Sequence, residues 1–313
     1  MKRILIFGSG VIGSTYGGLL AKSGCNVTLY SRGKRLSDLL KMGLLLQSSK
    51  DSKPEQIKVD VISEINQAIL YDYVFVTVRK EQINEALNEL ARINSQNFVF
   101  MVNNASGYDE WIKRLGDNKI IPAFPGSGGK IEQGIVFYEI VNRFIQPTTL
   151  GELSGKTTSR ISDLKKILSK SGFYVSISEN MDAWQKSHIA LVAPMAAVIY
   201  YDGGNNYTVS GNNKAINQMN LALKENFRFL KNSGIGIEPF KLNLVRITPL
   251  WVLNITMKLC FNTKWAENVI CNHSLTAKSE MSVIFEEFIT LAKSKEFELT
   301  QFAKLVNAGK LNL

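Results

Sequence analysis

Three glycines with the spacing Gly-x-Gly-x-x-Gly lie at positions 8, 10 and 13, directly after a short apolar run. In such a loop the first glycine permits a tight turn, the second lets a pyrophosphate approach the backbone, and the third lets the next helix pack closely on the strand. The helix that begins there offers N–H groups and a partial positive charge to phosphate oxygens. A glycine-rich turn without a ligand is the alternative. The pattern predicts a dinucleotide site made by Gly8, Ser9, Gly10, Val11, Ile12 and Gly13.

The residues that follow the second predicted strand indicate whether the dinucleotide is NAD or NADP. An acidic residue about 20 positions beyond the loop would accept the ribose 2′-hydroxyl of NAD, whereas an arginine suits the 2′-phosphate of NADP. The chain has Ser31-Arg32-Gly33-Lys34-Arg35 at this place and no acid. A solvated basic loop is the alternative. We predict that the cofactor is NADP and that Ser31 and Arg32 hold its 2′-phosphate.

The elements around the loop alternate between strand and helix patterns. Continuous apolar runs are typical of strands that are buried on both faces of a parallel sheet. Strands are predicted over residues 3–7, 26–30, 73–78 and 97–102, and helices over residues 11–23, 34–42 and 82–94. Residues 135–141 and 148–150 are predicted to be strands that complete this sheet. The sequence therefore predicts an α/β fold that begins with a Rossmann-type dinucleotide-binding domain.

Strand patterns disappear after about residue 180, and long helical patterns take their place. Helices are predicted over residues 184–201, 215–233, 239–260 and 278–295. We expect residues 1–180 to form the NADP-binding domain. Residues 181–313 are expected to form an all-helical C-terminal domain that binds substrate or forms a dimer.

Composition excludes several classes of protein. The 313 residues carry a net charge of +10, but no tract of five like charges occurs, which argues against a nucleic-acid-binding surface. The longest apolar run, residues 189–199, is too short to cross a bilayer, and the N-terminus lacks the apolar segment of a secretory signal. The three cysteines have no metal-ligand spacing. We expect a cytoplasmic protein with reduced cysteines, no metal and no membrane or nucleic-acid partner.

The order of several motifs resembles the ketopantoate reductases (2-dehydropantoate 2-reductases). Beyond the glycine loop and Ser31-Arg32, the matching motifs are Val76-Thr77-Val78-Arg79 with Gln82, Val102-Asn103-Asn104, Trp184-Gln185-Lys186 and Lys278-Ser279-Glu280-Met281. The resemblance spans almost the whole chain. It implies a Rossmann domain followed by a helical domain. It also implies NADPH-dependent reduction of a small 2-oxo acid, 2-dehydropantoate to pantoate, in pantothenate biosynthesis.

The resemblance also implies roles for individual residues. Arg79, Gln82 and Asn103 would lie near the cofactor, and Asn103 would also contact substrate. Lys186 matches the catalytic lysine, and Glu280 matches a carboxylate that helps to hold substrate, with Ser274 as the candidate for a substrate-binding serine. Hydride arriving at a carbonyl carbon builds negative charge on the oxygen, which a positioned ammonium group can stabilise and protonate.

The chain departs from the family pattern at several positions. Asn104 replaces a glycine, and Arg79 replaces a lysine. Ala190, and either Ala193 or Pro194, stand where family members have asparagines that contact substrate. A relative that acts on another carbonyl or imine, and a non-catalytic NADP-binding sensor, are therefore the alternatives to a 2-oxo acid reductase. A homodimer through the helical domain is a further possibility. The two histidines, His188 and His273, are too far apart in sequence to imply a site.

Overall fold

The computed structural model describes residues 1–309 and contains two compact units. Residues 1–102 and 108–181 form the first, called here the N-terminal unit. Residues 103–107 and the chain from Asp182 onward form the second, called here the helical unit. The short segment 103–107 groups with the helices because Ala105 packs in their apolar core. The prediction from sequence had kept this segment in the first domain.

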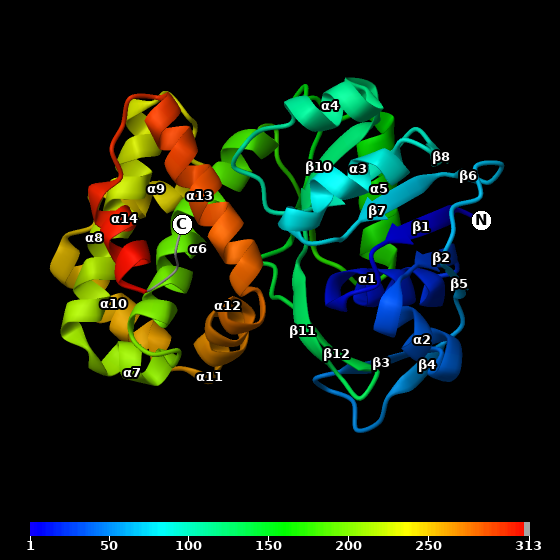
Figure 1. Ribbon diagram of the computed structural model, residues 1–313, viewed down its shortest axis with the longest axis horizontal. Helices are drawn as coiled ribbons and strands as arrows, with labels where there is room; N and C mark the ends of the chain where they lie inside the picture. The colour runs from blue at the N-terminus through cyan, green and yellow to red at the C-terminus, as the bar shows by residue number, and fades with distance from the viewer. Residues whose placement is uncertain (310–313) are drawn as a thin grey trace. The chain divides into compact units, whose positions relative to one another are not determined.

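An eight-stranded sheet forms the centre of the N-terminal unit (Figure 1). Its neighbouring strands pair in parallel, except that β10 and β13 pair antiparallel. In spatial order the strands are β14 (Val175–Ile177), β13 (Thr148–Leu150), β10 (Ile120–Phe124), β9 (Phe98–Met101), β7 (Tyr73–Val76), β1 (Arg3–Phe7), β2 (Asn26–Tyr30) and β5 (Asp60–Ile62).

Each face of this sheet carries its own apolar core. Side chains alternate along a strand, so Ile4 and Ile6 of β1 join one core while Leu5 and Phe7 join the other. The first core includes residues of α1 (Val11–Lys22), α2 (Gly33–Met42) and α5 (Ser159–Lys170). The second includes residues of α3 (Ile83–Leu90) and α4 (Asp109–Leu115). Helices thus cover both faces of a mostly parallel sheet, which confirms the predicted Rossmann-type architecture.

A second, four-stranded sheet corrects one prediction from the sequence. Its order is β11 (Ser127–Glu132), β12 (Ile135–Ile140), β3 (Leu44–Ser48) and β4 (Glu55–Ile57). The prediction that residues 135–141 complete the main sheet is wrong, because β12 forms a hairpin with β11 and then pairs in parallel with β3. A short pair, β6 (Leu70–Tyr71) and β8 (Asn94–Ser95), and two 3-10 turns, η1 (Lys80–Gln82) and η2 (Asp117–Lys119), complete the unit.

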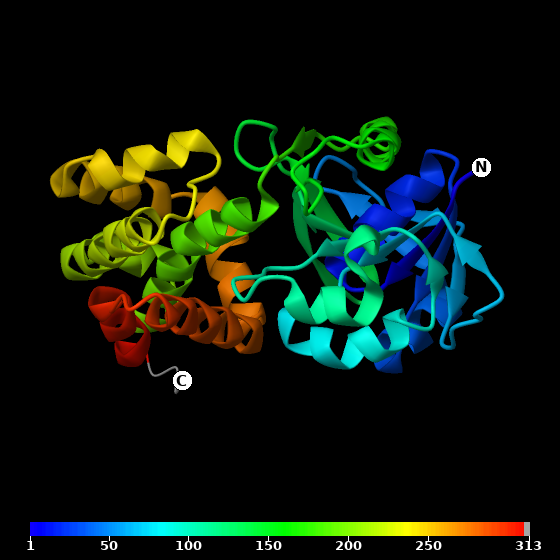
Figure 2. The ribbon, with the colours of Figure 1, turned by 90° about the horizontal axis from the view of Figure 1, so that it is seen from above.

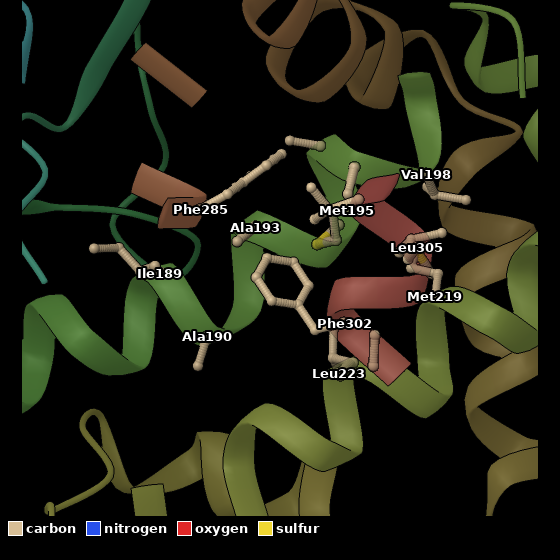
Figure 3. Close-up of a cluster of buried hydrophobic side chains, with 14 of the residues drawn as sticks. Ile189, Ala190, Ala193, Met195, Val198, Met219, Leu223, Phe285, Phe302 and Leu305 are labelled. Atoms are coloured by element: carbon tan, nitrogen blue, oxygen red, sulfur yellow. The ribbon is translucent and has the colours of Figure 1, made fainter. Parts of the chain in front are cut away.

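The helical unit packs around one apolar core to which α6, α8, α13 and α14 contribute (Figure 3). Its helices are α6 (Met181–Tyr201), α7 (Asn206–Gly211), α8 (Asn213–Asn232), α9 (Asn243–Ile247), α10 (Leu250–Phe261), α11 (Lys264–Ala266), α12 (Asn272–Thr276), α13 (Lys278–Ser294) and α14 (Thr300–Ala308), with short turns η3 (Phe240–Leu242) and η4 (Glu267–Cys271). This confirms the predicted all-helical second half.

Two prolines shape the helical unit. The prediction of one helix over 239–260 is wrong, because Pro249 forces Thr248 into an extended conformation with ψ of 132° and separates α9 from α10. Pro194 lies inside α6 and provides no N–H for the carbonyl of Ala190. Asn226 of α8 replaces that donor, with its Nδ2 3.3 Å from the Ala190 oxygen. Asn226 thus stabilises α6, which Pro194 would otherwise weaken.

Among residues 1–309, no single helix has the length and apolar character needed to cross a membrane. Phe240–Ile247 and Leu250–Phe261, a pair bent by 118°, meet that test only when taken together.

Candidate functional site

The glycine-rich loop joins β1 to α1 and leaves space where a phosphate would approach. Gly8 has φ of +109°, and a Cβ there would lie 2.9 Å from a Val78 methyl carbon. A Cβ on Gly13 would collide with the carbonyl oxygen of Gly8, whereas a Cβ on Gly10 would meet no atom within 4 Å. The N–H groups of the first turn of α1, at Val11 and Ile12, have no partners within the helix. The loop therefore has the tight turn, the open backbone and the close helix packing of a dinucleotide cradle.

Hydrogen bonds connect this loop to the end of β2. The hydroxyl of Ser9 donates to that of Ser31 at 2.5 Å, and both residues are buried. Arg35 of α2 donates from Nε to the Ser9 carbonyl and from Nη2 to the Ser14 hydroxyl, each at 3.1 Å. Arg35 was not predicted as a separate site residue, although the run Arg32-Gly33-Lys34-Arg35 was the available signal. Its contacts hold the loop against the first turn of α2.

Arg32, the predicted 2′-phosphate ligand, lies in a cluster with an acid from α3. Its Nη2 pairs with Glu89, its Nε donates to the Tyr30 hydroxyl at 2.7 Å, and Tyr30 in turn donates to the second oxygen of Glu89. The guanidinium also lies over the Tyr30 ring, 5.2 Å from its centroid. About half of the Arg32 side chain, 53%, is exposed. Glu89 was missed from sequence because it is 57 residues from Arg32.

The predicted residues Arg79 and Gln82 flank η1: Arg79 immediately precedes it, and Gln82 is its last residue. The side-chain oxygen of Gln82 accepts a hydrogen bond from the Arg79 backbone N–H at 3.1 Å. Thr77, two residues earlier, donates from Oγ1 to the Gly8 carbonyl at 2.6 Å. The carboxyl ends of β1 and β7 are therefore joined beside the glycine loop, where parallel α/β sheets bind ligands.

The helical unit brings together Asn103 and Glu280, which are 177 residues apart in sequence. Asn103 Nδ2 donates to Glu280 Oε1 at 3.4 Å. Glu280, near the start of α13, is 8% exposed. The side-chain oxygen of Asn103, Oδ1, is buried and has no hydrogen-bond partner among the residues that the structure describes. A buried amide oxygen without a donor is costly, and a ligand that donates a hydrogen bond would satisfy it.

Lys186 lies on the second turn of α6, and its side chain is only 12% exposed. Its ammonium pairs with Asp182, one turn earlier, at 2.5 Å. Sequence reasoning missed Asp182, although an acid four residues before a lysine on a helix is a recognisable signal. Asp182 thus holds the Lys186 ammonium toward the N-terminal end of α6.

Ser274, the predicted substrate serine, makes its contacts within the helical backbone. Its hydroxyl donates to the carbonyl of Ile270 at 2.7 Å, and its own carbonyl accepts from the Tyr200 hydroxyl. The residue is 2% exposed. Its hydroxyl proton therefore already has an acceptor within the turn that precedes it.

The two histidines, which the sequence did not connect, lie near one another in the helical unit. The His188 ring stacks on Trp184, with centroids 5.3 Å apart and an angle of 7° between the planes. Burial, together with the positive charge of His273, lowers the pKa of His188 to about 3. His188 is therefore uncharged at neutral pH. No group of three or more potential metal ligands occurs within residues 1–309.

A doubly wound sheet with a three-glycine loop after its first strand, joined to a helical unit, defines the class of two-domain oxidoreductases that use a nicotinamide dinucleotide. Residues 4–155 match the sequence model of the family described as Ketopantoate reductase PanE/ApbA. The 2-dehydropantoate 2-reductase of Pyrococcus horikoshii is 26% identical over 248 residues, which cover 77% of this chain and 78% of that protein. Over these residues the chain is similar to the ketopantoate reductases, as its motifs predicted.

Solved structures agree with this relationship at the level of the fold. A 2-dehydropantoate 2-reductase from Geobacter metallireducens GS-15 superposes with a TM-score of 0.80 at 16% identity, covering 99% of this chain and 100% of that one. D-mandelate dehydrogenase, solved with NADH and anilino(oxo)acetate, gives 0.77 at 16% identity, covering 98% and 97%. Both likenesses extend over the N-terminal unit and the helical unit.

Proposed function

We propose that this protein reduces 2-dehydropantoate to pantoate with NADPH as the reductant. The contact between Asn103 and Glu280 is the observation that carries the proposal. It joins two residues to which the family resemblance gives roles beside the nicotinamide and the substrate. The unpaired oxygen of Asn103 adds support, because it can accept a hydrogen bond from a hydroxyl group of the substrate or from the cofactor's carboxamide.

The preference for NADPH rests on the end of β2. Ser31 and Arg32 replace the acid that would bind the 2′-hydroxyl of NAD, and Lys34 and Arg35 add positive charge nearby. Arg35 is the more buried of the two arginines, and burial lowers the pKa of its guanidinium without removing its charge. The exposed Arg32 is better placed than Arg35 to bind a phosphate, provided that the phosphate replaces Glu89 as the partner of its guanidinium.

Lys186 is proposed as the proton donor. The glycine loop would hold the pyrophosphate of a nicotinamide dinucleotide, which when bound would supply a hydride to the substrate's carbonyl carbon, so that the carbonyl oxygen would gain negative charge. The Lys186 ammonium stabilises this oxygen and gives it a proton. Asp182 holds the ammonium group before substrate arrives, at 2.5 Å. Glu280, with Asn103, orients the hydroxyl end of the substrate.

Another 2-oxo acid, or a related carbonyl or imine, is the second candidate substrate. One and two turns beyond Lys186, α6 presents Ala190 and either Ala193 or Pro194, none of which has a polar side-chain atom. Ala190 is fully buried, and its carbonyl is occupied by Asn226. The family's polar contacts to pantoate are therefore replaced by apolar positions, which favours a substrate with fewer hydroxyl groups. A non-catalytic NADP-binding sensor is the third reading.

An initial-rate assay with the purified full chain tests the proposal. NADPH absorbance is followed with 2-dehydropantoate and with a panel of 2-oxo acids that carry straight, branched and aromatic side chains. The proposal expects the highest kcat/KM with 2-dehydropantoate. A higher value for an apolar 2-oxo acid supports the second candidate. Tight NADPH binding with no turnover of any compound supports the sensor.

A cytoplasmic location and a homodimer complete the proposal. All three cysteines are unpaired thiols, as is usual for proteins of a reducing compartment. No nucleic-acid or membrane partner is proposed, because the positive charge is dispersed along the chain and suits an anionic cofactor.

A further inference from the structure

Arg35 of α2 makes three hydrogen bonds within the N-terminal unit, and every acceptor is an uncharged oxygen. Nε donates to the Ser9 carbonyl, Nη2 to the Ser14 hydroxyl and Nη1 to the Gly134 carbonyl, each at 3.1 Å. Among residues 1–309 no carboxylate forms an ion pair with this half-buried guanidinium, and Asp38, one turn further along α2, lies beyond ion-pair distance. Charged side chains that leave solvent are usually paired with an opposite charge. The structure thus encloses a positive charge beside the glycine loop without an anion to balance it.

The carbonyl of Ser9 is held by two donors. Besides the Nε of Arg35, it accepts from the Ser14 hydroxyl at 2.9 Å, and Ser14 is fully buried. A trans peptide unit is planar, and its C=O and N–H point in opposite directions. Because the Ser9 oxygen is fixed toward Arg35, the N–H of Gly10 is aimed away from it. Within residues 1–309 no backbone oxygen accepts from that N–H or from those of the next two residues. Successive N–H groups of this kind, at the start of a helix, bind phosphate oxygens.

The third contact of Arg35 connects the loop to the second sheet. Gly134 lies in the turn between β11 and β12 and has φ of +84°. This hairpin packs against α1, and its green strands lie beside the dark blue helix in Figure 2. One guanidinium therefore joins α2, the glycine loop and a turn that is 99 residues further along the chain. Arginine suits this task because its five donors form a rigid planar fork, whereas lysine has a single nitrogen on a flexible stem.

We propose that Arg35 is a positioning residue of the pyrophosphate site: it holds the glycine loop so that its N–H groups face the pyrophosphate, and its unbalanced charge attracts that group. This assignment rests on the proposed nicotinamide dinucleotide cofactor. The two arginines then have separate tasks. Arg32 binds the 2′-phosphate, which only NADPH carries, and Arg35 serves the pyrophosphate, which NADPH and NADH share. Arg35 is therefore expected to set the affinity for both cofactors and not the preference between them.

Two fragments of the cofactor separate these tasks. ADP-ribose has the pyrophosphate but no 2′-phosphate, whereas adenosine 2′-monophosphate has the 2′-phosphate but no pyrophosphate. Neither fragment contains a nicotinamide, so their binding does not depend on the reaction. Isothermal titration calorimetry of the purified full chain measures the dissociation constant of each fragment.

Arg35→Met removes the charge and the three donors but keeps an unbranched apolar stem. It should weaken the binding of ADP-ribose roughly tenfold and change that of adenosine 2′-monophosphate by less than about twofold. Arg32→Ala is the matched control and should show the reverse pattern. Arg35→Lys restores the charge but not the planar fork, so it should recover part of the loss and bind ADP-ribose roughly threefold more weakly than wild type.

Ser14→Ala is a second variant, for use if Arg35→Met does not fold. It removes the hydroxyl that accepts from Arg35 and donates to the Ser9 carbonyl. It should weaken the binding of ADP-ribose roughly threefold and leave that of adenosine 2′-monophosphate unchanged. Circular dichroism and the Tm establish that each variant is folded.

A folded Arg35→Met that binds ADP-ribose as tightly as wild type would overturn the role of Arg35, as would an equal loss of both fragments. A loss confined to adenosine 2′-monophosphate would also overturn it and would move Arg35 to the 2′-phosphate. These outcomes leave the proposed reaction intact, provided that the wild type binds NADPH. A wild type that binds neither fragment nor NADPH would overturn both the role of Arg35 and the proposed cofactor.

Discussion

Glu89→Gln should strengthen the binding of NADPH and leave the binding of NADH nearly unchanged. In the structure Glu89 occupies the guanidinium of Arg32, the group that we assign to the 2′-phosphate. The phosphate must therefore share or displace a carboxylate. Glutamine keeps the shape, and its one side-chain oxygen can still accept a hydrogen bond from Arg32, but it removes the negative charge.

The magnitude follows from the separation and exposure of the charges. Two anions that share one guanidinium lie about 5 Å apart, where repulsion between unit charges is about 1 kcal/mol in water and about 3 kcal/mol at an effective dielectric constant of 20. Arg32 is 53% exposed, so the lower value applies. Glu89→Gln should tighten NADPH binding roughly fivefold. Arg32→Ala should weaken it roughly tenfold, because a charge-assisted hydrogen bond contributes about 1.5 kcal/mol at the low end of its range.

Fluorescence titration with NADPH and NADH measures both dissociation constants for each variant. Glu85→Gln is the matched control, since it removes the same charge from the same helix but lies 3.9 Å from Arg32 and is 82% exposed. It should change the NADPH constant by less than about twofold. The reasoning is refuted if Arg32→Ala and Glu89→Gln both leave the ratio of the two dissociation constants at its wild-type value.

Three further predictions concern the glycine loop, the proposed proton donor Lys186 and the partly buried His188. Gly10→Val should abolish cofactor binding, because its side chain fills the space that the pyrophosphate needs, and should leave the Tm unchanged, because that space is otherwise open. Gly13→Ala should lower the Tm, because its Cβ would collide with the Gly8 carbonyl oxygen. A Gly10→Val protein that binds NADPH normally would show that the loop is only a turn. Lys186→Ala should lower kcat by roughly 10²–10⁴-fold with little change in NADPH affinity. A decrease in kcat of less than about threefold would show that Lys186 is not the proton donor. The depressed pKa of His188, about 3, means that the unfolded chain takes up a proton as pH falls below about 6.5 while the folded chain does not. The wild type should therefore lose about 2 kcal/mol more stability between pH 7.5 and 5 than His188→Gln, as measured by urea unfolding, and parallel pH profiles would contradict this cause.

The parts of the fold that repeat a local pattern could be predicted from the sequence. The buried strands β1, β2, β7 and β9 appear where continuous apolar runs predicted them, within two residues at each end. The helices α6, α8 and α13 follow from apolar spacing of three and four residues. These signals are local, because the spacing of apolar residues within a helix or strand indicates which of its residues are buried.

Features that depend on distant partners could not be predicted. The placement of β12 in a second sheet depends on β3, about 90 residues earlier, and alternation within β12 does not reveal which sheet it joins. The break at Pro249 was present in the sequence, but the apolar spacing on both sides outweighed it. The exposure of Trp251, Ile255 and Leu259 on α10 was likewise not predicted, because apolar spacing along a helix normally indicates burial.

In the candidate site, too, local motifs could be predicted from the sequence, and contacts between distant residues could not. The glycine loop and Lys186 are recognisable from local motifs, whereas the contacts of Arg32 with Glu89 and of Asn103 with Glu280 join residues 57 and 177 positions apart. Only the family resemblance connected Asn103 and Glu280 in advance. No such resemblance was available for Glu89.

Transfer of deuterium from labelled cofactor to product tests the central claim most directly. The wild-type protein is incubated with 2-dehydropantoate and with NADPH in which deuterium replaces both hydrogens on C4 of the nicotinamide. The pantoate is then analysed by mass spectrometry. Direct hydride transfer predicts pantoate that is one mass unit heavier than the unlabelled product, with the label on the hydroxyl-bearing carbon. Lys186→Ala should form the same labelled product far more slowly. Absence of pantoate, or pantoate without deuterium, would contradict the account.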